Sequence, residues 1–128
     1  MDGLHLTADL RACDTSLAAM TETLALRLLC LGAVARAGLQ PVGELFHRFP
    51  APGGVTGVVL LAESHVAVHT WPELAAVTLD VYVCNHGCDN SGRAHALLDA
   101  LIASFAPKGV ERNALYRGAP AKPTTIST

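Results

Sequence analysis

The eleven-residue segment from Glu63 to Glu73 concentrates side chains that can do chemistry. It reads ESHVAVHTWPE and contains the hydroxyl of Ser64 and the imidazoles of His65 and His69. An imidazole titrates near neutral pH, which suits it to proton transfer. Further along the chain, the thiol of Cys84 is a group that can deliver a proton. A hydroxyl, a base and a proton donor are together the components of acid–base catalysis.

This segment closely resembles the self-processing motif of the prokaryotic S-adenosylmethionine decarboxylases. The resemblance continues in order through Gly3-Leu4-His5, Phe46-His47-Arg48-Phe49, Gly54-Val55-Thr56-Gly57, and Asp80 with Cys84. It covers roughly residues 3 to 84, and after Cys84 only a helix followed by a strand agrees. The resemblance implies a carboxy-lyase that makes decarboxylated S-adenosylmethionine, the aminopropyl donor for spermidine biosynthesis.

The resemblance also implies that the chain cuts itself between Glu63 and Ser64. The serine hydroxyl would attack the preceding carbonyl and turn the amide into an ester. Elimination would leave dehydroalanine, which becomes a pyruvoyl group at the new N-terminus. A serine is needed because the leaving oxygen must sit on Cβ. We therefore expect chains of residues 1–63 and 64–128, with pyruvoyl as the cofactor that forms a Schiff base with the substrate and accepts electrons as CO₂ leaves.

The same resemblance assigns roles to five other side chains. His69 is the expected processing base, and Cys84 is the expected proton donor to the substrate Cα. Thr56 stands where the family commonly has serine; it keeps the hydroxyl but adds a methyl group and a stiffer χ1. The Glu73 carboxylate would hold the ribose hydroxyls. The Phe49 ring would stack on adenine and face the sulfonium in a cation–π contact.

Two other functions stay open at this point. The same pyruvoyl chemistry could act on arginine or ornithine, although Glu73 and Phe49 argue against a substrate with no ribose or adenine. A non-catalytic binding protein with the same fold is the other alternative. The presence of Ser64, His69 and Cys84 argues against it.

Hydrophobic periodicity predicts the elements that must position these residues. Strands are expected over residues 4–10, 41–48, 55–62, 65–71, 75–84 and 110–117. Helices are expected from a cap among residues 14–16 to about residue 37, and from about residue 94 to 105. Short links between consecutive strands favour antiparallel pairing, with both helices on one face. The prediction is an α+β two-layer sandwich, in one domain over residues 1–117 with a loose tail over 118–128.

The predicted strands raise a geometrical problem for the site. Thr56 and Ser64 are eight residues apart, which is about 26 Å along a straight strand. Strict alternation also places Ser64 and His69 on opposite faces of a sheet. Either the chain turns sharply at residues 63–65, or Thr56 and His69 come from a second subunit. A two-fold homodimer with shared sites answers both problems, and the family resemblance implies the same.

Composition limits the partners and the location. The 128 residues are 51% hydrophobic with a net charge of -2 and no Lys/Arg cluster, so nucleic acid is a poor candidate partner. No apolar run is long enough to span a membrane. The N-terminus lacks the pattern of a secretory signal, so we expect a cytoplasmic protein with four free thiols. The spacing of Cys84 and Cys88, with no second pair, predicts no metal site.

Overall fold

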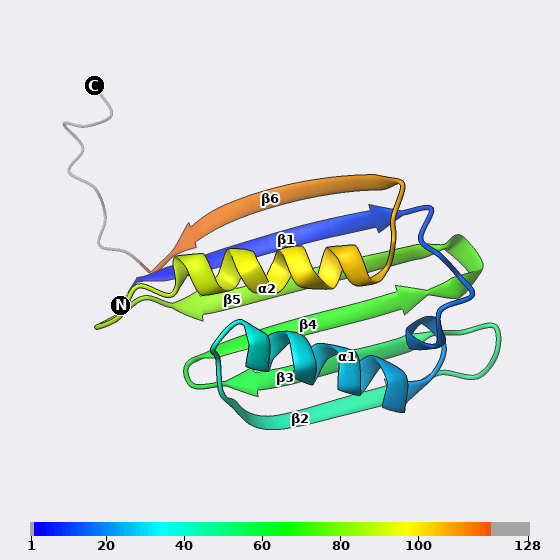
Figure 1. Ribbon diagram of the computed structural model, residues 1–128, viewed down its shortest axis with the longest axis horizontal. Coiled ribbons are helices and arrows are strands. Elements are labelled where there is room, and N and C mark those ends of the chain that lie inside the picture. Colours follow the sequence, from blue (N-terminus) through cyan, green and yellow to red (C-terminus); the bar gives the residue numbers. More distant parts are fainter. Residues whose placement is uncertain (1, 119–128) are drawn as a thin grey trace.

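The computed structural model describes residues 2–118 and arranges them in two layers (Figure 1). The strands are β1 (Gly3–Arg11), β2 (Pro41–Arg48), β3 (Val55–Leu61), β4 (Ser64–Trp71), β5 (Ala76–Cys84) and β6 (Gly109–Arg117). The helices are α1 (Thr23–Arg36) and α2 (Ser91–Ser104), with 3-10 turns η1 (Ala18–Met20) and η2 (Pro72–Leu74). The strands form one sheet in the order β2-β3-β4-β5-β1-β6, with every neighbouring pair antiparallel. The predicted α+β sandwich is confirmed; residues 119–128 of the expected tail lie outside the described part.

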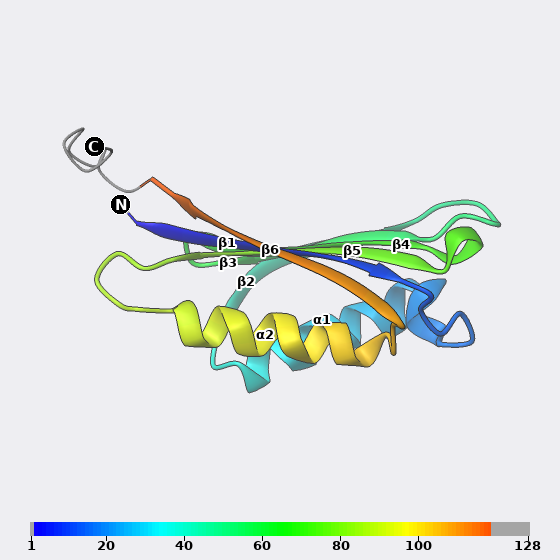
Figure 2. The ribbon, with the colours of Figure 1, turned by 90° about the horizontal axis from the view of Figure 1, so that it is seen from above.

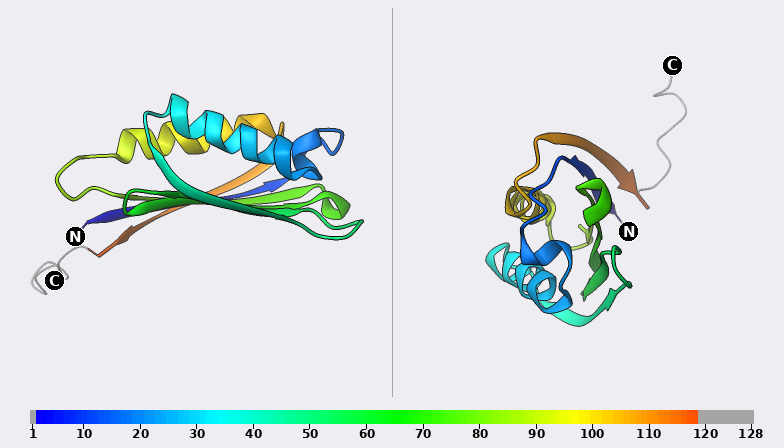
Figure 3. Two further views of the ribbon diagram at one scale, coloured as in Figure 1. Left: turned by 90° about the horizontal axis from the view of Figure 1, so that it is seen from below. Right: turned by 90° about the vertical axis from the view of Figure 1, so that its right-hand side faces the viewer.

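Both helices cover one face of the sheet and leave the other face open (Figures 2 and 3). Strand alternation explains this division, because every second side chain of β1, β4 and β5 is apolar and buried under the helices. The buried set from these strands includes Leu4, Leu6, Ala8, Leu10, Val66, Val68, Val77, Leu79, Val81 and Val83. The alternate side chains of the same strands form the open face. Neither helix within residues 2–118 combines the length and the apolar character of a membrane span.

The first helix begins later than the sequence pattern predicts. A cap among residues 14–16 was expected, but α1 starts only at Thr23. The Asp14 carboxylate accepts hydrogen bonds from the amide of Ser16 at 3.0 Å and from its hydroxyl at 2.6 Å. Such a local bond competes with helix formation and closes a turn instead. The chain then makes the short η1 turn before α1, so this part of the prediction was wrong.

The sharpest reversal of the chain joins β3 to β4. Only Ala62 and Glu63 lie between the two strands, and Leu61 pairs directly with Ser64. At the far end of the same hairpin Thr56 pairs with His69. The turn therefore lies slightly earlier than residues 63–65. Ser64 and His69 lie toward opposite ends of β4, and the antiparallel register brings Thr56 beside His69 rather than beside Ser64.

The hydroxyl of Thr70 ties this hairpin to the rest of the core. Thr70 is 3% exposed, and its Oγ1 accepts a hydrogen bond from the Val55 amide at 2.8 Å. The same hydroxyl donates to the Met20 carbonyl at 2.8 Å. Gly54 lies so close that a Cβ there would stand 2.1 Å from the Thr70 carbonyl oxygen. One buried side chain thus joins the start of β3, the end of β4 and η1.

Replacing this hydroxyl with a methyl group should destabilise the fold. In an uncleaved Ser64→Ala background, Thr70→Val keeps the shape but leaves the Val55 amide and the Met20 carbonyl without their partner. We expect a loss of roughly 1–3 kcal/mol of unfolding free energy, measured by urea denaturation. Thr7→Val on the half-buried open face is the matched control. Equal losses in the two variants would contradict the role given to Thr70.

Candidate active site

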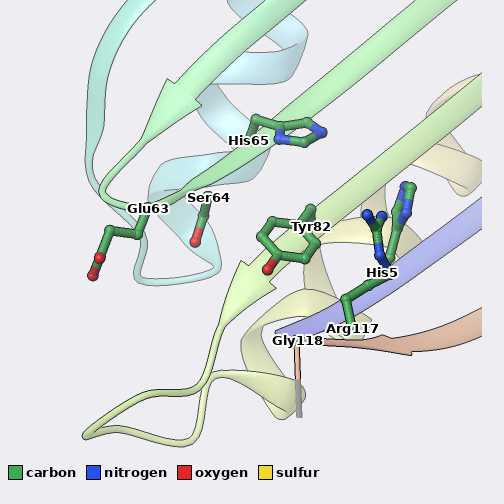
Figure 4. Close-up of a pocket in the computed structure, with 7 residues that line it drawn as sticks. All are labelled: His5, Glu63, Ser64, His65, Tyr82, Arg117 and Gly118. Carbon is green, nitrogen blue, oxygen red and sulfur yellow. The ribbon is translucent and has the colours of Figure 1, made fainter. Parts of the chain in front are cut away.

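Two cavities lie toward opposite ends of β4. The first, which we call the Ser64 cavity, measures about 380 Å³ and is lined by His5, Glu63, Ser64, His65, Tyr82, Arg117 and Gly118 (Figure 4). The second, the His69 cavity, measures about 320 Å³ and is lined by Phe49, Gly53, Gly54, Thr56, His69, Thr70, Trp71 and Glu73. The predicted site residues other than Cys84 all line one of these two cavities.

The structure brings Ser64 and Cys84 together at the first of these ends. Ser64 begins β4, Cys84 ends β5, and the Cys84 amide donates a hydrogen bond to the Ser64 hydroxyl at 3.1 Å. Cys84 is only 8% exposed. The hydrogen bond makes Ser64, the predicted nucleophile, a direct neighbour of Cys84, the predicted proton donor. The amide also orients the hydroxyl, because it occupies one of the lone pairs on the serine oxygen.

The loop after β5 holds Cys84 in place. The Asn90 side-chain amide donates to the Cys84 carbonyl at 2.8 Å, and the Asn90 backbone amide donates to the Asn85 side chain at 2.7 Å. The Asn85 amide in turn donates to the Asp2 carbonyl at 2.6 Å. This segment had no assigned role in the sequence, and its contacts show that it fixes the end of β5.

Contact with Ser64, rather than burial, distinguishes Cys84 from the other cysteines. All four thiols are free, and three of them, Cys13, Cys30 and Cys84, are buried. Desolvation raises the pKa of the Cys30 thiol to about 12 and also raises the pKa of Cys13. These two thiols belong to the hydrophobic core. Of the buried cysteines, Cys84 is the one in contact with Ser64. Within residues 2–118 no cluster of three or more His, Cys, Asp or Glu side chains could hold a metal ion.

The second cavity gathers the predicted binding and processing residues. The Thr56 hydroxyl and the His69 Nδ1 share a hydrogen bond of 2.9 Å between β3 and β4. The His69 ring stacks on Trp71 with centroids 5.7 Å apart and an interplanar angle of 24°. Phe49 is 45% exposed, and Glu73 lies in η2 directly after Pro72. Thr56, His69, Phe49 and Glu73 are thus assembled in one place by the fold.

Within one chain, the pair formed by Ser64 and Cys84 lies apart from the residues that line the His69 cavity. Ser64 and His69 are five residues apart in β4, which corresponds to about 16 Å along a strand. The sharp turn that was one of the two alternatives is present, because the chain reverses at Ala62 and Glu63. The reversal returns Thr56 to the side of His69 instead of bringing it to Ser64.

The open face beside Ser64 also holds an aromatic cluster that sequence reasoning did not assign to the site. Tyr82 stacks on His65 at 5.7 Å and 24°, and His5 meets both rings edge-on at 6.0 and 6.3 Å. Asp80 Oδ1 lies 3.5 Å from His5 Nε2. Gly3 makes room for the ring, since a Cβ there would stand 2.3 Å from the Tyr82 hydroxyl oxygen. Strand alternation was the signal that could have grouped these residues.

The surroundings of His65 lower its pKa. Burial lowers the pKa of His65, and the nearby charge of His5 lowers it further, while the Asp80 carboxylate acts in the opposite direction. The Ser64 cavity therefore favours an uncharged imidazole at His65.

Comparisons with known proteins find similar sequences and a similar fold. The sequence pattern of the family described as S-adenosylmethionine decarboxylase matches residues 4–118. An S-adenosylmethionine decarboxylase proenzyme from Aquifex aeolicus is 39% identical over 116 residues, which cover 91% of this chain and 81% of that protein. One from Archaeoglobus fulgidus is 34% identical over 91% of this chain and 97% of its own length. The crystal structure of the adenosylmethionine decarboxylase from Aquifex aeolicus superposes with a TM-score of 0.82 at 35% identity, covering 94% of each chain.

The lowered pKa of His65 predicts a pH-dependent stability. The unfolded chain takes up a proton at His65 near its ordinary value of about 6.5, whereas the folded chain does so only at lower pH. The unfolding free energy should therefore fall as pH drops below about 6.5. Urea denaturation of Ser64→Ala at pH 7.5 and 5.5 measures this fall, and adding His65→Gln should make it smaller. His95→Gln on the exposed side of α2 is the control; if both substitutions change the fall equally, burial of His65 is not its cause.

Proposed function

This chain belongs to the S-adenosylmethionine decarboxylase family, and from that premise we propose how its own residues mature it and carry out the reaction. It is the proenzyme of a decarboxylase of polyamine biosynthesis, and arginine and ornithine are not favoured as substrates. The observation that carries the residue assignment is the hydrogen bond from the Cys84 amide to the Ser64 hydroxyl. It joins the residue that would form the cofactor to the one that would donate the proton.

Maturation cuts the chain between Glu63 and Ser64. This peptide bond lies at the hairpin turn, where Glu63 is exposed and Ser64 is half-buried, so the products can separate locally. The strands of the two products alternate in the sheet, so the products can stay associated after the cut. Residues 1–63 contribute β1, β2 and β3, while residues 64–128 contribute β4, β5 and β6. In the order β2-β3-β4-β5-β1-β6 strand β1 lies between two strands of the other product, which keeps the cut chains together.

The group made from Ser64 is a pyruvoyl, which supplies the electron sink for decarboxylation. The site fits it, because the residue that generates it begins a strand beside a donating amide and a 380 Å³ cavity. Cys84 delivers a proton to the substrate Cα, and its burial keeps water from competing for that position. This role requires a reduced thiol, which accords with a cytoplasmic location.

A complete site is formed by two copies of the chain. Ser64 and Cys84 of one copy meet Thr56, His69, Phe49 and Glu73 of the other across a two-fold axis. Two observations support this arrangement: the two groups lie at opposite ends of β4, and one face of the sheet has no covering layer within residues 2–118 (Figure 3). His69, hydrogen-bonded to Thr56, then serves as the base during maturation.

The His69 cavity suits a nucleoside sulfonium substrate. The Phe49 ring is 45% exposed and is held edge-to-face by His47 at 4.6 Å, so it is available for stacking on adenine. The Glu73 carboxylate in the same cavity can accept hydrogen bonds from two ribose hydroxyls. A plain amino acid would leave both groups unused, which supports S-adenosylmethionine over arginine or ornithine.

Substitutions should separate maturation from turnover. The wild-type chain should give two fragments by intact mass and decarboxylate S-adenosylmethionine, with arginine and ornithine as comparison substrates. Ser64→Ala should abolish both cleavage and activity. Cys84→Ala should still give cleaved chain, but turnover should fall about 10²- to 10⁴-fold, as for loss of a general acid. A single unmodified wild-type chain after long incubation, or full activity of Cys84→Ala, would contradict these assignments.

Complementation tests the shared site. Ser64→Ala cannot form the pyruvoyl group but keeps His69, whereas His69→Ala keeps Ser64 and lacks the base. Neither variant alone should be cleaved. Co-expressed with different affinity tags, the two variants should give a mixed dimer with one intact site, so some His69→Ala chains should be cleaved. Absence of cleavage in mixed dimers that are recovered through both tags would rule out the two-copy site.

A further inference from the structure

The residue before the bond to be cut has an unfavourable backbone. Glu63 has φ 54°, in the left-handed region that residues with a Cβ rarely adopt. Ala62 and Glu63 are the whole connection between β3 and β4, and the antiparallel pairing of Leu61 with Ser64 closes it. Glycine and asparagine are the residues that such a position normally selects, because they adopt it at little cost. Here the turn carries a glutamate.

Nothing in the surroundings of the Glu63 side chain accounts for this choice. The side chain points away from the other residues of the Ser64 cavity (Figure 4), and Glu63 is exposed. No ion pair among residues 2–118 includes it. Three alanines, Ala12, Ala75 and Ala106, have similarly positive φ values between 47° and 51°. Unlike Glu63, none of them precedes a serine.

We propose that Glu63 is a positioning residue whose left-handed backbone strains the peptide bond to Ser64 and thereby speeds self-cleavage. The inference deepens the proposed function and rests on it for the identity of the cut bond. Strain of this kind persists only where the surrounding structure enforces it. Here the hairpin enforces it from both sides, since β3 and β4 are each paired with further strands.

The first step of maturation releases this strain. The Ser64 oxygen forms a bond to the Glu63 carbonyl carbon, the bond from that carbon to the Ser64 nitrogen breaks, and the hydroxyl proton ends on the freed amine. Atoms and electrons balance without any co-reactant. In the ester, Oγ and Cβ replace the Ser64 nitrogen between the Glu63 carbonyl carbon and the Ser64 Cα, so the turn gains one atom and new rotatable bonds. Glu63 can then leave the left-handed region, and the energy stored in the starting state lowers the barrier.

The test separates backbone conformation from side-chain chemistry. The full chain and its variants are made in a short pulse of cell-free synthesis, and cleavage is followed by intact mass. Glu63→Gly and Glu63→Asn relieve the strain and should slow cleavage by up to about 5- to 30-fold, the equivalent of the usual left-handed penalty. Glu63→Gln and Glu63→Ala keep a strained Cβ and should cleave at the wild-type rate.

Two results would overturn the proposal. One is cleavage of Glu63→Gly and Glu63→Asn at or above the wild-type rate. The other is equal slowing by Glu63→Gln and Glu63→Ala, which would assign the effect to the carboxylate. Ala106→Gly is the matched control, because it relieves the same conformation beyond α2, far along the chain from Ser64. It should leave the cleavage rate unchanged.

A stability measurement tests the strain independently of cleavage. In the Ser64→Ala background, Glu63→Gly and Ala106→Gly should each raise Tm by roughly 2–5 °C, whereas Glu63→Gln should not. A Glu63→Gly chain that is no more stable than its parent contains no strain to release, which overturns the proposal. If the wild-type chain is never cleaved, the proposed function fails, and the Tm comparison still reports on the strain by itself.

Discussion

The register of the β3–β4 hairpin is the constraint on which the rest of this molecule depends. Antiparallel pairing places Leu61 opposite Ser64 and Thr56 opposite His69, with two residues to make the turn. A slip of one residue would move every side chain of β4 to the other face, exposing the valines of the core. The same hydrophobic burial that stabilises the sheet therefore also decides where each reactive group lies.

The two faces of the sheet have different roles. The covered face buries valine, leucine and alanine side chains against α1 and α2, and this burial drives folding. The open face bears histidines, a tyrosine and small residues at the alternate positions of the same strands. Thr70 is the exception, a buried polar side chain whose hydroxyl is fully used by Val55 and Met20. Its bonds hold the end of β4 where His69 and Trp71 project toward the His69 cavity.

The errors in the sequence-based predictions have local physical causes. Hydrophobic spacing predicted that the first helix begins at residues 14–16. Instead, the Asp14 carboxylate accepts hydrogen bonds from Ser16, and these bonds stabilise a turn in place of the helix. A turn near residues 63–65 stayed one of two alternatives, because alanine and glutamate, which make the turn, carry no turn signal. Left-handed Glu63 is an unusual solution to that turn. Sequence rules that identify turns from glycine or asparagine therefore do not predict this turn.

The sequence by itself determined the fold class and the residues with the chemistry. Alternating and helical hydrophobic patterns are local properties, so the strands and helices could be inferred with boundaries close to those observed, except at the start of α1. The motif around Ser64 indicated the reaction through its resemblance to a known family, which extends over several segments in the same order. Only the tertiary structure decided that Ser64 contacts Cys84, that Thr56, Phe49 and Glu73 gather around His69, and that these two groups lie at opposite ends of one strand. Such contacts depend on strand order and register, which are set by packing between segments far apart in the chain rather than by any local pattern.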